Sequence, residues 1–266
     1  MFTINPFSIL AETVPSIALQ SFVIVMIALV IIGTLVDIIH KKNVKYFFEN
    51  AKKAKLSATK TLSAGEKISV ISKTIVSDIA TTSELGAGKR RADHLLGMYG
   101  TILFWAGSAV MIFCYSSPSS DTPSYWPIIW HVGAIMTVVG GSWFWFFLRV
   151  DVYSEAHPWY RIIKADLFVL ALIASSLFGL IWSCLQSLDL NDRWDDKVFL
   201  VLYIISNLVL FGGVYWSKFA HMFYKPGAAM QKNLAEADGS RDNLPPPADA
   251  PEQYGLGIDR EKAKHY

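Results

Sequence analysis

Long apolar stretches alternate with polar segments along most of the chain. The apolar runs cover residues 16–39, 95–115, 126–148, 165–186 and 198–219. Each run has about 20 residues, the length that a helix needs to cross ~30 Å of hydrocarbon. The pattern therefore predicts an all-α integral membrane protein that forms a five-transmembrane-helix bundle.

The segment before the first run contains no basic residue. Residues 1–15 hold no lysine or arginine, whereas a cleaved signal peptide has a basic region before a short apolar core. The apolar run that follows is long, so we expect it to be retained as the first span. Residues 1–15 are then an external N-terminal segment.

Lysine and arginine residues are unevenly divided between the segments that flank the spans. In chain order these six segments hold 0, 12, 0, 3, 2 and 7 of them. Cytoplasmic segments carry the excess of basic residues. The predicted orientation is therefore N-terminus out and C-terminus in, with residues 95–225 forming a four-helix membrane bundle beside the first span.

Composition supports a membrane protein and removes several function classes. The chain is 53% hydrophobic and only 17% charged, which is typical of the membrane class. Its two cysteines, Cys114 and Cys184, lie in apolar runs and form no iron–sulfur or zinc motif. No nucleophile–base constellation, phosphate loop or metal-hydrolase motif is present, so we expect neither independent bond cleavage nor a nucleic-acid partner.

Residues 40–94 form a basic cytoplasmic loop. Ser63-Ala-Gly-Glu66 matches a capping box, which predicts the start of an amphipathic helix. The helix carries isoleucines at three- to four-residue spacing: Ile68, Ile71, Ile75 and Ile79. Two interpretations remain open for this loop, a solvated segment on anionic lipid and a docking surface for a soluble partner.

Residues 226–266 are rich in proline and polar residues. They predict a cytoplasmic, largely disordered tail after a short helix at 228–237. No internal repeat is visible in the chain, which gives a small transporter built from inverted repeats little support.

Several histidines fall at the predicted cytoplasmic ends of the spans: His40, His94, His157 and His221. His94 opens the second span and His221 closes the fifth, so antiparallel helices place both at one depth. Imidazole pairs on facing helices are the usual axial ligands of a b-type haem. Each histidine alone also fits an interfacial role.

Small and basic residues accompany this histidine pair. Gly97, Gly100, Thr101 and Gly107 follow His94 and would let a flat macrocycle approach the backbone. Arg91 and Lys218 lie close to the two histidines in sequence and could meet the haem propionates.

Other polar residues in or beside the spans have two interpretations each. Asp37, Asp151 and Asp166 lie at inner helix ends, where they form interfacial ion pairs or a proton route for a quinone. His131, beside Trp130, is expected to be an interfacial or helix-contacting histidine. Asn207, deep in the fifth span, is expected to bond across helices rather than line a pocket.

The last span resembles that of the respiratory nitrate reductase gamma subunit family of membrane cytochromes b. The family pattern Ser-[Lys/Arg]-x-x-His-x4-Pro stands here as Ser217-Lys218-Phe-Ala-His221-Met-Phe-Tyr-Lys-Pro226. His94 matches the position of the partner ligand, and the similarity covers roughly residues 90–232. Within the family, the basic first loop and the run from Lys89 to Gly100 look most like the membrane anchors associated with adenylylsulfate (APS) reductase.

The resemblance implies an electron-transfer subunit of the bacterial inner (cytoplasmic) membrane. His94 and His221 would ligate one haem b that links a soluble cytoplasmic flavin/iron–sulfur oxidoreductase, docked on residues 40–94 and the tail, to quinone. The family's second haem uses histidines where this chain has Phe104 and Tyr203, so no outer haem is expected. The alternative is a haem-free membrane anchor, and catalysis by the chain itself would be limited to reaction with quinone.

Overall fold

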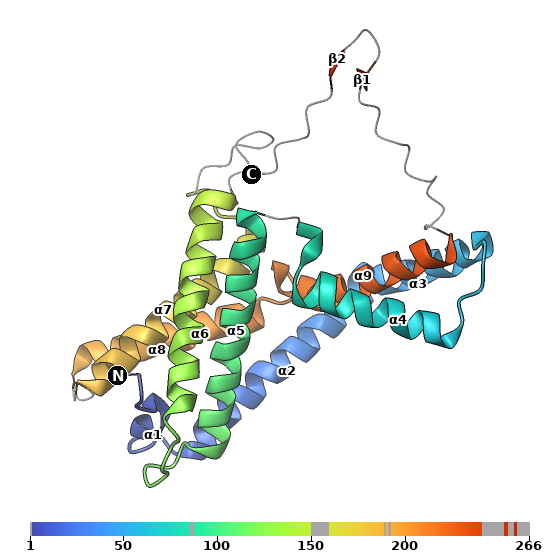
Figure 1. Cartoon of the computed structure of the whole chain (residues 1–266). Coiled ribbons are helices and arrows are strands. Elements are labelled where there is room, and N and C mark those ends of the chain that lie inside the picture. The colour runs from blue at the N-terminus through green and yellow to red at the C-terminus, as the bar shows by residue number, and fades with distance from the viewer. Residues whose placement is uncertain are drawn as a thin grey trace. The chain divides into compact units, whose positions relative to one another are not determined.

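The computed structural model describes residues 2–85, 88–149, 160–188, 190, 193–240, 253–254 and 258–259. Within these residues the chain is helical, apart from a short antiparallel pairing between β1, Gln253–Tyr254, and β2, Ile258–Asp259. The predicted all-α class is therefore confirmed (Figure 1).

The helices differ widely in length. The α-helices are α1, Pro6–Leu10; α2, Ser16–Lys41; α3, Asn43–Ala54; α4, Ala64–Thr74; α5, Lys89–Cys114; α6, Tyr125–Trp143; α7, Leu167–Ser187; α8, Trp194–Gly212; and α9, His221–Asp238. The 3₁₀ turns are η1, Lys55–Ser57; η3, Ser83–Leu85; η5, Lys164–Asp166; and η6, Lys218–Ala220. The π-helical turns are η2, Ile75–Ala80, and η4, Phe144–Leu148.

The chain divides into two compact units. Unit 1 consists of Met1–Lys41 and Arg90–Met222, and unit 2 consists of Lys42–Lys89 and Phe223–Tyr266. Lys42 has a left-handed backbone with φ of 55°, which interrupts the helical path between α2 and α3. Each unit thus combines two segments that are far apart in the sequence.

Among the described residues, four helices are long and apolar enough to cross a membrane. All four lie in unit 1, except that the second begins at Lys89, which is assigned to unit 2. They are Ser16–Lys41, Lys89–Cys114, Tyr125–Leu148 and Lys164–Ser187. In α2, only 11% of the most apolar 18-residue stretch is buried, against 44% in the last of the four helices. Of the four helices, α2 therefore leaves the largest share of its apolar stretch exposed. Apolar helices of this length suit a lipid environment, which indicates a membrane protein.

The predicted fifth span, residues 198–219, is matched only in part. Its helix, α8, runs from Trp194 to Gly212 and begins with Asp195, Asp196 and Lys197. Without this charged turn about 15 residues remain, or ~22 Å of helix at ~1.5 Å per residue, which is short of ~30 Å of hydrocarbon. The five-span count and the orientation therefore stay predictions.

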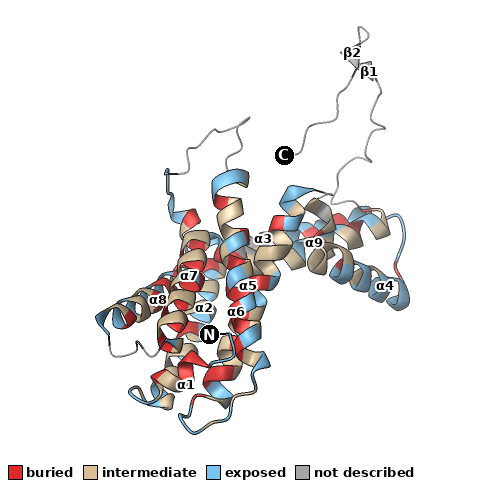
Figure 2. Cartoon of the chain, turned by 60° about the vertical axis from the view of Figure 1, so that its left-hand side comes forward, coloured by how far each residue is buried: buried red, intermediate tan, exposed pale blue. Residues whose placement is uncertain are grey.

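Aromatic side chains build the core of unit 1. Trp130 and Trp182 are fully buried, and Trp182 stacks on Tyr203 with ring centroids 6.0 Å apart. The ring centroids of Phe104 and Trp130 are 5.2 Å apart. The ring of Phe7 in α1 lies 5.9 Å from that of Trp130 and 5.6 Å from that of Trp182, again between centroids. The N-terminal segment is therefore part of this core, and Figure 2 shows buried positions along α6 and α7 in red.

The helices α5 and α6 lie side by side and touch through glycines (Figures 1 and 2). A Cβ atom on Gly100 would lie 2.7 Å from the backbone nitrogen of Thr137, and one on Gly133 would lie 2.8 Å from the carbonyl oxygen of Gly100. A Cβ atom on Gly140 would lie 2.8 Å from the nitrogen of Gly97. No side chain fits at these distances, so the two backbones are in direct contact.

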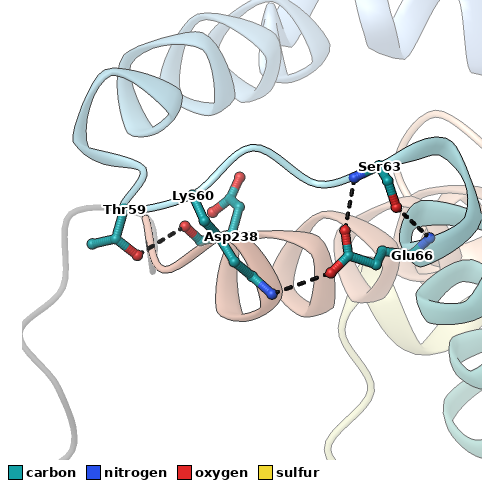
Figure 3. A network of polar contacts seen from close by, with 5 residues as sticks. All are labelled: Thr59, Lys60, Ser63, Glu66 and Asp238. Carbon is teal, nitrogen blue, oxygen red and sulfur yellow. Dashed lines mark hydrogen bonds and ion pairs between the residues drawn. The ribbon is translucent and has the colours of Figure 1, made fainter.

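Unit 2 contains the predicted capping box. The Ser63 hydroxyl accepts the backbone N–H of Glu66 at 3.3 Å, and the Glu66 carboxylate accepts that of Ser63 at 2.8 Å (Figure 3). Lys60 lies 3.5 Å from the same carboxylate. Figure 3 also shows the Thr59 hydroxyl, which donates to the carbonyl of Asp238 at 3.3 Å and joins this loop to the end of α9.

Asn233 of α9 joins α9 to α4 and η2. Its amide donates to the Asp78 carboxylate at 2.6 Å and to the Thr74 hydroxyl at 2.8 Å. The predicted isoleucine face is only partly covered, because Ile68 and Ile75 are 65% and 45% exposed. Polar side-chain bonds therefore contribute to this packing beside apolar contact.

The short helix predicted at residues 228–237 is part of α9, which continues through Pro226 to Asp238. The predicted disorder of the later tail falls mainly on residues 241–252, 255–257 and 260–266, which lie outside the described residues.

Replacing Gly133 by alanine should destabilise unit 1, because the added methyl group clashes with the backbone of α5. We expect a loss of about 1–3 kcal/mol, typical of overpacking, and a lower thermal midpoint of the purified protein. Gly212→Ala is the matched control, since nothing lies within 4 Å of its Cβ position. Equal midpoints for the two variants would contradict the direct backbone contact.

Unit 2 should lose local stability in acid. The hydrogen bonds from Asn233 and then Ser83 lower the pKa of Asp78 below its ordinary 3.8. A lowered folded pKa gives stability that is present above the unfolded pKa and is lost as the pH falls through the folded one. Hydrogen exchange of residues 74–80, corrected for intrinsic rates, should show weaker protection as the pH falls from about 5 to about 3.

Asn233→Ala should lower that protection already at neutral pH and flatten its acid dependence. The expected loss is about 0.5–1 kcal/mol, because solvent screens the partly exposed carboxylate. Asn50→Ala, at an exposed position of α3, is the control and should behave as the native chain. An unchanged pH profile in the Asn233 variant would refute the role of this bond.

Candidate functional site

His94 lies in the second turn of α5, beside a buried carboxylate. His94 is half-buried, and its neighbour Asp93 is 5% exposed. One turn further on, nothing lies within 4 Å of the Cβ position of Gly97. Residues three apart share a helix face, so open space lies beside the imidazole on this face.

The chain that leads to His221 is held in the core of unit 1. Ser217 accepts the backbone N–H of Phe219 at 3.2 Å and so caps η6. Phe219 is 1% exposed. Its ring stacks on that of Trp105, with centroids 6.0 Å apart, and meets that of Phe168 edge to face, with centroids 5.4 Å apart. The serine of the family pattern thus has a structural role, and His221 follows as the first residue of α9.

Of the two predicted haem ligands, only His94 has a described side chain. His94 and His221 belong to the same unit, as do half-buried Arg91 and exposed Lys218. The side chain of His221 lies outside the described residues, as does His157, so the separation of the two imidazoles stays untested. No group of three or more metal-ligating side chains gathers among the described residues, and a two-histidine site falls below that number.

The small residues that follow His94 serve a different purpose from the one predicted. Gly100 faces Thr137 of α6, and a Cβ atom on Gly107 would lie 2.9 Å from that of Trp130. The expectation that these two glycines leave room for a macrocycle is therefore wrong, because α6 occupies that space. Open space remains at Gly97 alone among these three glycines.

The two positions that hold histidines in the resembled family lie in the aromatic core. The rings of Phe104 and Tyr203 meet edge to face with centroids 6.5 Å apart. Trp130 and Trp182 pack against them, and the Trp130 indole N–H donates to the Ser108 hydroxyl at 2.8 Å. Side chains thus fill the space around both positions.

His131 is a buried, helix-contacting residue of unit 1. Its Nδ1 lies 2.7 Å from the carbonyl oxygen of Pro127, and its Nε2 lies 2.8 Å from the Ser183 hydroxyl of α7. A carbonyl oxygen only accepts hydrogen bonds, so Nδ1 carries the proton and Nε2 accepts from Ser183. Both ring nitrogens are therefore engaged in joining α6 to α7.

A second polar bond joins α7 to α8. The Ser175 hydroxyl donates to Asn207 Oδ1 at 3.1 Å, and the Asn207 amide donates to the carbonyl of Tyr203 at 2.8 Å. The prediction that Asn207 bonds across helices is confirmed. Sequence reasoning missed its partner and Ser183, although Ser175, Gly179 and Ser183 recur at the four-residue spacing of a helix-contact face.

Two of the three aspartates at the helix ends, Asp37 and Asp166, form ion pairs. Asp166 pairs with Arg149, whose guanidinium also donates to the carbonyl of Arg161 at 2.7 Å and lies 3.9 Å from the centre of the Trp145 ring. Asp37 pairs with Lys41. The ion-pair interpretation is confirmed for both, whereas Asp151 lies outside the described residues.

Ser183→Ala should weaken the contact between α6 and α7, because it leaves the buried Nε2 of His131 without a donor. The expected cost is about 1–3 kcal/mol in the free energy of unfolding. Ser206→Ala is a matched control, since the buried Ser206 hydroxyl donates only within its own helix, to Leu202 at 2.7 Å. Thermal unfolding of both variants in one detergent measures the difference, and equal losses would argue against the His131–Ser183 bond.

Comparisons with protein-family models, with curated proteins and with solved structures found no match. The resemblance to membrane cytochromes b therefore rests on the residues of the sequence.

Proposed function

We propose that this protein is a membrane anchor and electron-transfer subunit. It would link a cytoplasmic flavin/iron–sulfur oxidoreductase, adenylylsulfate reductase, to the quinone pool through one b-type haem. It would cross the bacterial inner membrane five times, with its N-terminus out and its C-terminus in. The observation that carries the proposal is that His94 and the segment of His221 belong to one compact, membrane-type helical unit.

The proposed haem site uses residues from α5, η6 and α9. His94 and His221 would hold the iron as neutral imidazoles, and Arg91 and Lys218 would offset the charge of the propionates. A bound haem supplies one-electron exchange at this site. The open space at Gly97 and the ordered segment before His221 support this assignment.

A single haem at one end of the bundle limits where quinone reacts. Electrons at the cytoplasmic end cannot cross ~30 Å of hydrocarbon without a second carrier. Aromatic side chains fill the core around Phe104 and Tyr203. We therefore propose that quinone exchanges electrons with the haem in the cytoplasmic half of the membrane.

The soluble partner would dock on residues 40–94 and the tail. Residues 40–94 alone carry half of the lysines and arginines of the chain, 12 of 24. Exposed side chains on α3 include Lys45, Lys52 and Lys53. Such a surface attracts an acidic partner through long-range electrostatics.

A haem-free anchor is the second candidate function. The observation that favours it is the direct contact of α5 with α6, which fills the space at Gly100 and Gly107. In that case His94 and His221 are interfacial histidines, and the chain only recruits its partner to the membrane.

Reduced-minus-oxidised optical spectra of the purified protein separate the two candidates. The electron-transfer subunit should show the α-band of a b-type haem, and His94→Ala and His221→Ala should each remove at least about nine-tenths of it, since each removes an axial ligand. His40→Ala is the control, because His40 is an exposed histidine of unit 1 that contacts Tyr215.

The outcomes have distinct meanings. A spectrum without an α-band after supply of haem would replace the first candidate by the haem-free anchor. Haem retained in both ligand variants, or lost in the His40 variant, would overturn the ligand assignment. Co-purification of a flavin/iron–sulfur enzyme with the native chain tests the partner separately.

A further inference from the structure

The helix α3 has two faces of different chemistry. On one face, Ala51 and Ala54 lie three residues apart and are buried. On the other, Lys45, Phe48 and Lys52 follow one another at three- to four-residue spacing, and all three are exposed. The outer face of α3 is completed by the exposed residues beside them, Tyr46, Glu49 and Lys53. This outer face is therefore turned away from the packed side of the helix.

Large apolar side chains stand among the lysines of the outer face. Phe48 is 65% exposed and Tyr46 is 55% exposed. The Phe48 ring meets that of half-buried Phe47 edge to face, with centroids 5.6 Å apart. Leu56, in the η1 turn that follows, is 89% exposed. Such a face suits a membrane interface, where aromatic rings and lysine stems enter the headgroup region and the ammonium groups meet phosphates.

Unit 2 as a whole is positively charged, its tail included. Residues 42–89 hold nine lysines and four carboxylates, a net charge of +5. Residues 223–266, the other segment of the unit, hold six basic and seven acidic residues, a net charge of −1. The tail therefore cannot neutralise the lysines of the first segment.

The outer face itself has more lysines than carboxylates. Glu49 is the only carboxylate in residues 42–60, and it lies 3.7 Å from the ammonium group of Lys45. It can offset one lysine of the face, which leaves the charges of Lys52 and Lys53 in excess. The face is therefore complementary to an anionic surface.

A membrane-type helix ends immediately before α3. The helix α2 runs to Lys41, and only Lys42 separates it from Asn43, the first residue of α3. At ~1.5 Å per residue, the first half of α3 lies within ~12 Å of Lys42, whatever the angle between the two helices. Membrane surface charge acts over about 10 Å at ~0.1 M salt, so this connection keeps α3 within its reach.

We propose that α3 is an interfacial helix whose outer face binds the anionic phospholipid surface around the end of α2. The ammonium groups of Lys45, Lys52 and Lys53 meet the lipid phosphates, and the Phe48 ring enters the headgroup region. An acidic protein would attract the same lysines, but the exposed aromatic rings and the direct connection to α2 favour lipid. Lipid binding by α3 leaves α4 and the tail to a soluble partner, and it does not depend on haem.

Spin labelling of the full chain in lipid nanodiscs tests the proposal. The label is placed at Phe48→Cys after Cys114→Ser and Cys184→Ser have removed the native thiols. Its collisions with oxygen, which concentrates in lipid, and with a water-soluble nickel complex report where it lies. Phosphatidylglycerol should bring the label into lipid, whereas phosphatidylcholine alone should leave it mainly in water. A label at Ile68→Cys of α4, which is also 65% exposed, is the matched control and should stay in water in both.

Two pairs of charge variants make the test specific. Lys52→Gln with Lys53→Gln should lower the ratio of lipid-bound to released label about 25-fold in phosphatidylglycerol, because each lysine at an anionic surface contributes about fivefold. Lys67→Gln with Lys73→Gln, at exposed positions of α4, removes the same charge and should change the ratio less than about twofold. Tyr46→Cys gives a second label position on the outer face that keeps Phe48 in place.

Three results would overturn the proposal. Labels at positions 48 and 46 that both stay in water in phosphatidylglycerol would show that α3 does not bind lipid, and their immobilisation by poly-glutamate would make it a docking surface for an acidic protein instead. Equal entry into phosphatidylcholine would remove the lysines from recognition. An equal loss in the α4 variant would make the effect one of net charge rather than of the outer face.

Discussion

The direct contact between the backbones of α5 and α6 is the constraint on which unit 1 depends. Gly100, Gly133 and Gly140 allow the two helices to approach so closely that no side chain fits between them. Trp130 and Phe104 then meet at the edge of this seam and begin the aromatic core. Large side chains are thereby excluded from the seam and fill the space between α5, α6, α7 and α8.

Local features of this fold are predictable because they depend on neighbouring residues. The apolar runs predict helices at the observed places, and the serine and glutamate of the capping box predict where α4 begins. A polar residue deep in an apolar helix needs a partner, which is why Asn207 could be expected to bond across helices. Interfacial ion pairs at Asp37 and Asp166 follow from the cost of an unpaired charge near lipid.

Contacts between distant segments were harder to foresee. In a sequence, a row of glycines is equally compatible with a bound macrocycle and with a second helix packed against it. Only the structure shows that α6 packs against Gly100 and Gly107. The apolar run of the predicted fifth span continues past Gly212, yet the helix ends there and the chain turns to bury Phe219. The partner of His131 is likewise a serine on another helix, which no local pattern around His131 contains.

The division into two interleaved units has a consequence for biosynthesis. Residues 42–89 leave the ribosome before most of unit 1, but their partner residues from 223 onward are made last. During that interval Asp78 and Thr74 lack Asn233, and the capping-box loop lacks the carbonyl of Asp238. The first part of unit 2 therefore lacks these hydrogen-bond partners until α9 has been made, after the helices of unit 1.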